Sequence, residues 1–208
     1  MGNYNQWDYK MMMNRTELAT AVEPLDSSFA RMIRADMTEV EQVPTPFLVN
    51  GAVYRVTHLL PTRPVVFTVG CVGSGAVLLA GKPEAYSIFA DVGGVRLDDD
   101  AARLAYAVTF LETTRSFGER FQILSSVDDI LPRHRLEPGE IERLEALRAR
   151  LRDRVAPSAI TGNDPWEVIV FAIHGQALEQ ITLTLDSDGS IVSTRETLEP
   201  DLPIAYAW

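Results

Sequence analysis

The sequence contains little cysteine, and none of its hydrophobic runs is long. Its single cysteine, Cys71, excludes a disulfide within the chain of 208 residues. The longest apolar stretches, such as residues 64–81, are interrupted by glycine or proline well short of the roughly 18–20 residues that span a bilayer. No positively charged leader followed by an apolar run opens the chain. We therefore expect a cytoplasmic protein with no membrane partner.

Lysine and histidine are also scarce. Lys10 and Lys82 are the only lysines, and the formal net charge of −10 would repel the phosphates of a nucleic acid. The three histidines, His58, His134 and His174, lie far apart in the sequence and show no metal-ligand spacing. We expect no nucleic-acid partner, no metal site and no cofactor.

Several segments show the periodicity of regular structure. Apolar residues recur at helical spacing from Asp26 until Pro44, and Asn50-Gly51 favours a hairpin over residues 47–60. Three carboxylates at residues 98–100 precede the clearest helix start. The further helices are predicted over residues 83–89, 101–115 and 138–153, the last with Ile141, Leu144, Leu147 and Leu151 inward. Strands are predicted over residues 65–69, 76–79, 121–124, 166–173, 181–185 and 191–198.

These segments define a fold class. Helices and strands are segregated instead of alternating regularly, which favours an α+β fold over a doubly wound α/β fold. We expect a largely antiparallel sheet, with a meander at the C-terminal end, covered by two to four helices. Residues 14–208 are predicted to form a single domain, and residues 1–13 either a flexible tail or an extension upstream of a start at one of the methionines 11–13.

A glycine-rich loop is the first candidate site. It follows a predicted strand, and its backbone N–H groups could bind a phosphate or another small ligand. Its glycine spacing fits no nucleotide-binding pattern, and a tight β-turn or bulge explains it better. Cys71 could be a nucleophile with a histidine as base, or an inert core residue. The candidate ligand-binding residues are Gly70, Cys71, Gly73, Ser74, Gly75, His58 and His174.

The C-terminal segment, residues 200–208, is the second candidate. It is apolar and aromatic, whereas exposed tails are normally polar, and its two prolines restrict its backbone conformation. We expect it to dock either on its own domain or on a partner subunit. Its candidate contact residues are Leu202, Ile204, Tyr206 and Trp208.

No motif reaches the specificity that would indicate a known family or a catalytic site. The sequence therefore predicts a non-enzymatic accessory or protein-interaction protein, with a protein partner or a homo-oligomer. The alternative is a small-molecule-binding domain or enzyme with a site near residues 70–75.

Overall fold

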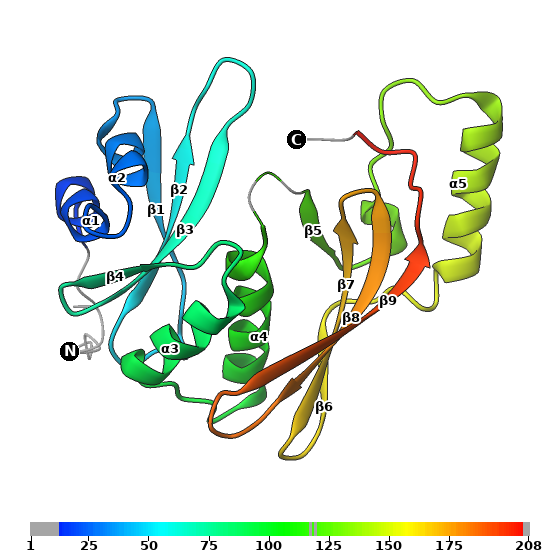
Figure 1. The fold of residues 1–208 in the computed structure, drawn as a ribbon. Helices are drawn as coiled ribbons and strands as arrows, with labels where there is room; N and C mark the ends of the chain where they lie inside the picture. The colour runs from blue at the N-terminus through cyan, green and yellow to red at the C-terminus, as the bar shows by residue number, and fades with distance from the viewer. Residues whose placement is uncertain (1–12, 117, 119, 206–208) are drawn as a thin grey trace, which may run out of the picture. The chain divides into compact units, whose positions relative to one another are not determined.

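The computed structural model describes residues 13–116, 118 and 120–205 (Figure 1). Over these residues the chain forms five α-helices and two antiparallel sheets, of four and five strands. The fold is therefore α+β, as predicted, and its C-terminal strands form the predicted meander.

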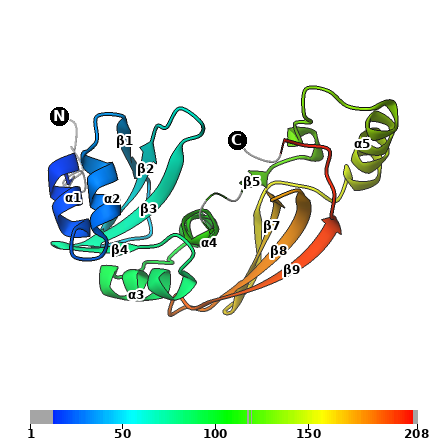
Figure 2. The ribbon, with the colours of Figure 1, turned by 45° about the horizontal axis from the view of Figure 1, so that its top comes forward.

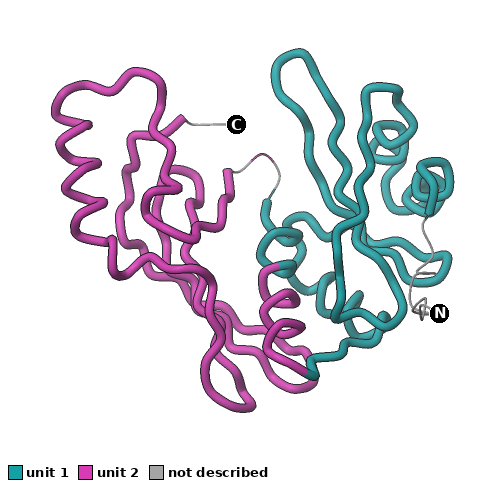
Figure 3. The backbone as a smooth tube through the Cα atoms, turned by 180° about the vertical axis from the view of Figure 1, so that it is seen from behind, with its two compact units in different colours: residues 1–98, 109–117 teal, residues 99–108, 118–208 magenta. Residues whose placement is uncertain are grey.

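The chain divides into two compact units (Figure 3). Unit 1 takes in residues 1–98 and 109–117, and unit 2 takes in residues 99–108 and 118–208. The boundary falls within one helix, α4 (Asp100–Thr114), whose first half belongs to unit 2 and whose second half belongs to unit 1. The single domain expected over residues 14–208 stays a prediction.

Unit 1 is a four-stranded antiparallel sheet in the order β1-β2-β3-β4. The helix that begins at Ser27 has the predicted N-cap: the Asp26 side chain accepts hydrogen bonds from the Ser28 hydroxyl and from the N–H groups of Ser28 and Phe29, and these bonds lower the pKa of Asp26. The helix over residues 15–22, which Asn14 caps, was not predicted. The elements are α1 (Arg15–Val22), α2 (Ser27–Arg34), β1 (Thr38–Val43), β2 (Ala52–His58), β3 (Val65–Val72), β4 (Gly75–Leu78) and α3 (Pro83–Gly93).

The unit 1 sheet buries both faces because side chains alternate along each strand. Val56, Phe67 and Val69 lie on the face toward α1 and α2, where Leu18 and Ile33 are fully buried. Figure 2 shows these two helices side by side. On the other face α3 packs on β3, and the Thr68 hydroxyl of β3 donates to a backbone carbonyl in the second half of α4 at 2.9 Å.

One predicted helix and one predicted hairpin are wrong. The helix expected from Asp26 until Pro44 ends at Arg34, and Thr38–Val43 is strand β1. Strand β2 pairs with β1 and with β3, and Asn50-Gly51 does not turn a hairpin. Instead the Asn50 N–H donates to the Gly93 carbonyl at 2.8 Å, which ties this segment to the end of α3.

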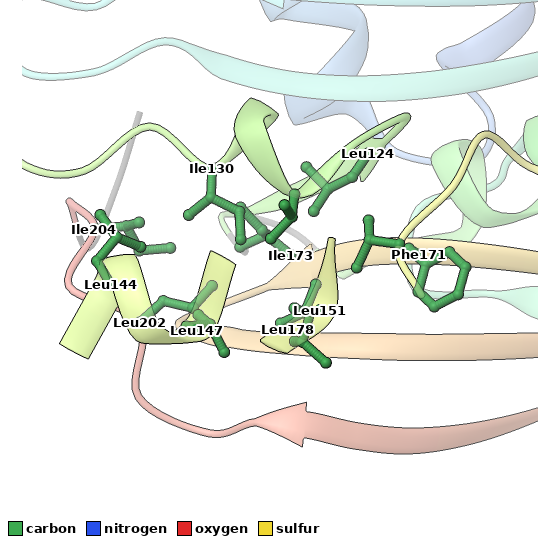
Figure 4. Close-up of a cluster of buried hydrophobic side chains, with 12 residues drawn as sticks. Leu124, Ile130, Leu144, Leu147, Leu151, Phe171, Ile173, Leu178, Leu202 and Ile204 are labelled. Carbon is green, nitrogen blue, oxygen red and sulfur yellow. The ribbon is translucent and has the colours of Figure 1, made fainter. Parts of the chain in front are cut away.

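Unit 2 is a five-stranded antiparallel sheet in the order β5-β7-β8-β9, with β6 also paired to β7. The hydrophobic cluster on one face comes from α5, a short 3-10 turn, β5, β7, β8 and the C-terminal segment (Figure 4). The elements are β5 (Phe121–Leu124), the turn η1 (Val127–Asp129), α5 (Pro138–Leu151), β6 (Ala159–Gly162), β7 (Trp166–His174), β8 (Ala177–Leu185) and β9 (Ile191–Glu199).

Helix α5 covers this cluster with fewer apolar side chains than predicted. Leu144, Leu147 and Leu151 are buried as expected, but Ile141 is 45% exposed, so its inward placement was wrong. The first half of α4 contacts the turn between β8 and β9, where the Tyr106 hydroxyl donates to the Gly189 carbonyl at 2.8 Å.

Candidate functional site

The predicted glycine-rich loop is the β3–β4 hairpin of unit 1. Val72 pairs with Gly75, so only Gly73 and Ser74 lie outside the ladder, and Gly73 has the positive φ of +57° that a tight turn requires. Gly70 and Cys71 are themselves paired to β4. The segment therefore consists of two paired strands joined by a two-residue turn. It is not an open six-residue loop whose backbone N–H groups could surround a ligand.

Gly70 allows helix α3 to pack closely on strand β3. A Cβ atom at this position would lie 2.8 Å from the Phe89 ring of α3, closer than real Cβ contacts allow. Phe89 is itself only 3% exposed, so the ring has little room to retreat. The missing side chain at Gly70 is what allows α3 to approach the sheet.

Cys71 points to the opposite face of the same strand. It belongs to the buried cluster beneath α1 and α2 and is only 4% exposed. Burial raises the pKa of its thiol to about 12, which suppresses the reactive thiolate at neutral pH. These surroundings are those of an inert core residue.

We expect Cys71→Ser to lower the free energy of unfolding by about 1–2 kcal/mol, because it puts a hydroxyl into an apolar cluster. Cys71→Ala is the control that keeps the site apolar, and it should cost less. A thiol reagent should label the native protein far more slowly than the unfolded protein. Equally fast labelling of both forms would contradict the buried, inert thiol.

The candidate histidines do not join Cys71. The His58 Nδ1 atom lies 2.8 Å from the Thr38 hydroxyl, at the end of β2, whereas Cys71 pairs with Ala52 at its beginning. Six residues of strand separate these positions by about 20 Å. His174 belongs to unit 2. Within unit 1 the candidate ligand site is thus not assembled around Cys71 and His58.

His174 instead joins a polar cluster across three strands of unit 2, which was not predicted from the sequence. Its Nδ1 atom lies 3.0 Å from Arg195 Nη1 of β9 and 3.5 Å from Glu179 Oε2 of β8. Arg195 Nη1 is also 3.4 Å from that carboxylate oxygen. The cluster connects β9 to β7 across β8 and neutralises the charge of Arg195. Alternation along each strand can be read from the sequence, but the register that puts all three residues on one face cannot.

The C-terminal candidate segment lies partly on the core of unit 2. Leu202 and Ile204 are 2% and 0% exposed and belong to the cluster beneath α5 (Figure 4). The backbone is held as well, because Leu202 N–H donates to the Gln176 carbonyl at 2.8 Å and Arg120 donates to the Ala205 carbonyl at 2.9 Å. These contacts are internal to unit 2.

The other two predicted contact residues, Tyr206 and Trp208, lie outside the described residues. Their place in a partner contact stays a prediction.

An exposed apolar surface is present at one end of the unit 1 sheet. Leu59 N–H donates to the Met37 carbonyl at 2.8 Å, which brings the start of β1 beside the loop after β2. Met37, Leu59 and Leu60 are 61%, 39% and 43% exposed. We call these three residues the apolar tip. The apolar tip was not predicted, because a helix predicted over residues 26–43 excludes the pairing of β1 with β2.

No known family model matches the chain, and neither the curated proteins nor the solved structures provide a match. In the described part of the chain, no three His, Cys, Asp or Glu side chains are grouped so that they could hold a metal ion. None of the helices described is long and apolar enough to cross a membrane.

Proposed function

We propose that this chain is a non-enzymatic protein-interaction protein that contacts its partner through the apolar tip. The observation that supports the proposal is that Met37 and Leu59, joined by a backbone hydrogen bond, and Leu60, the next residue along the chain, are all exposed at the end of a sheet. Loops between strands are normally polar, and clustered exposed apolar side chains are typical of interaction sites.

The loop between β2 and β3, residues 59–64, also has a restricted backbone that suits it to binding. Pro61 and Pro64 fix two φ angles between β2 and β3, which reduces the entropy lost when the loop is ordered against a partner. No acidic residue lies within residues 59–64, and Arg63 is its one charged residue. The proposed partner is accordingly a protein with an apolar surface, and the net charge of −10 disfavours nucleic acid. A cytoplasmic location is part of this proposal.

The double variant Met37→Glu/Leu60→Glu tests it. We expect the wild-type chain, expressed at its native level, to co-purify with a stoichiometric protein, and the double variant to lose it, because two carboxylates would be desolvated in the contact. Mass determination of everything that stays bound is the measurement. Leu131→Glu is the matched control, since Leu131 is a 62% exposed leucine of unit 2.

The control should retain the protein partner. Retention of the same partner by the double variant, or a wild-type chain that carries only a small molecule, would contradict the proposal. The second of these results would support the alternative, a ligand-binding domain or enzyme.

A further inference from the structure

Strand β9 is a long sheet edge. It spans nine residues, Ile191–Glu199, and its central residues 192–197 are all exposed. Among the described residues, β8 is its only strand partner. Figure 2 shows β9 at the margin of the unit 2 sheet. Such an edge presents a row of backbone groups that can pair with another strand.

The register identifies which backbone groups of β9 point outward. The β7–β8 hairpin has a two-residue turn closed by His174 and Ala177, so odd-numbered residues of β8 bond to β7 and even-numbered residues bond to β9. The bond from Asp186 N–H to the Ser190 carbonyl at 3.0 Å agrees with this alternation. The residues of β9 with outward N–H and C=O groups are therefore Ile191, Ser193, Arg195 and Thr197.

The edge has few of the features that prevent strand addition. Lysine and proline are absent from β9, and its bulge lies near the far end, opposite Leu178 and Glu179. Its two central charges are paired within the unit: Arg195 with Glu179 and His174, and Glu196 with Arg154 at 2.7 Å. The edge therefore presents no isolated charge to an incoming strand, although like charges placed directly opposite each other would still repel.

We propose that β9 pairs with β9 of a second copy of this chain, antiparallel and about a twofold axis at Thr194. The two sheets then form one continuous sheet, and the four outward residues of each copy exchange about eight backbone hydrogen bonds. This contact is separate from the apolar tip and does not depend on the proposed function.

Avoidance of like-charge pairs selects this register. A twofold axis normal to the sheet at Arg195 or at Glu196 would put two like charges directly opposite each other, which is destabilising. With the axis at Thr194, threonine faces threonine, and Ser193 of each copy faces Arg195 of the other. Placing the axis nearer either end of β9 shortens the ladder. The strand is therefore complementary to itself in one long register.

Charge substitution at Ser193 tests the register. Ser193→Glu puts a carboxylate opposite Arg195 of the second copy, and Ser193→Arg puts a like charge there. Two symmetry-related pairs change at once, so we expect the dimer dissociation constant to fall roughly two- to thirtyfold in the first variant and to rise by a similar factor in the second. Sedimentation equilibrium of the full chain over a wide concentration range measures both.

Ser193→Pro removes an outward N–H group and should abolish the dimer, since proline is tolerated at the outer side of an edge strand but cannot donate. Its circular dichroism melt should match that of the wild type at a protein concentration below the dimer dissociation constant, where both proteins are monomers. The variant Met37→Glu/Leu60→Glu should still dimerise, which separates this contact from the apolar tip. A wild-type chain that stays monomeric throughout, or a dimer that responds equally to Ser193→Glu and Ser193→Arg, would overturn the proposal.

Discussion

Replacing Ile204 with alanine is expected to lower the free energy of unfolding of unit 2 by about 2–5 kcal/mol. Ile204 is fully buried in the cluster beneath α5, which also contains Ile130 and Leu144 (Figure 4). The chain around it is fixed, because Arg133 N–H donates to the Pro203 carbonyl at 3.1 Å. A cavity left at this position therefore cannot close easily. Denaturant unfolding, followed by hydrogen exchange of the β7 and β8 amides, measures the loss within unit 2.

Leu131→Ala is the matched control for this change. Leu131 belongs to the same unit but is 62% exposed, so its truncation should change the stability by no more than about 0.5 kcal/mol. If Ile204→Ala were as mild as the control, the C-terminal segment would not be part of the core. Its apolar composition would then have to be explained by a partner subunit.

Elements with strong local signals could be predicted from the sequence. The helix start at residues 98–100 and the meander after residue 166 both appear as expected, because capping carboxylates and strand alternation act between near neighbours. The apolar C-terminal segment was also expected to dock, and the structure buries Leu202 and Ile204 in unit 2. Composition alone indicated burial there because two prolines and several apolar residues stand together.

Strand β1 shows where local pattern fails. Its sequence, from Thr38 to Val43, has two glutamates and a glutamine, and it follows a helical run without glycine or proline. The strand forms because every one of its residues pairs with a residue of β2, and that pairing cannot be recognised from residues 38–43 alone. Because β1 was not predicted, neither its pairing with β2 nor the apolar tip could be predicted.

Candidate sites were harder to predict than elements because they depend on which residues meet. Cys71 and His58 stand on neighbouring strands, yet pairing positions them near opposite ends of β2. Glu179 and Arg195 carry no site motif as isolated residues, and only the β7–β8–β9 register brings them to His174. Residue chemistry was visible in the sequence, whereas register was not.

Gly70→Ala is expected to lower the free energy of unfolding of unit 1 by about 1–3 kcal/mol, as overpacking of a filled core does. The new Cβ atom would lie 2.8 to 3.0 Å from three atoms of the Phe89 ring. Gly75→Ala is the control in the same hairpin. There the nearest described atom is the Val72 carbonyl oxygen at 3.5 Å, an ordinary contact, so alanine should be neutral or stabilise by up to about 0.5–1 kcal/mol.

A double-mutant cycle with Phe89→Leu separates packing from a ligand role for this glycine. If the ring is what excludes a side chain at Gly70, the cost of Gly70→Ala should be smaller in the Phe89→Leu background, as measured by denaturant unfolding of all four proteins. An equal cost in both backgrounds would contradict the packing explanation. The glycine would then be required for a reason other than the approach of α3, and binding of a small ligand at the β3–β4 turn would again have an observation to support it.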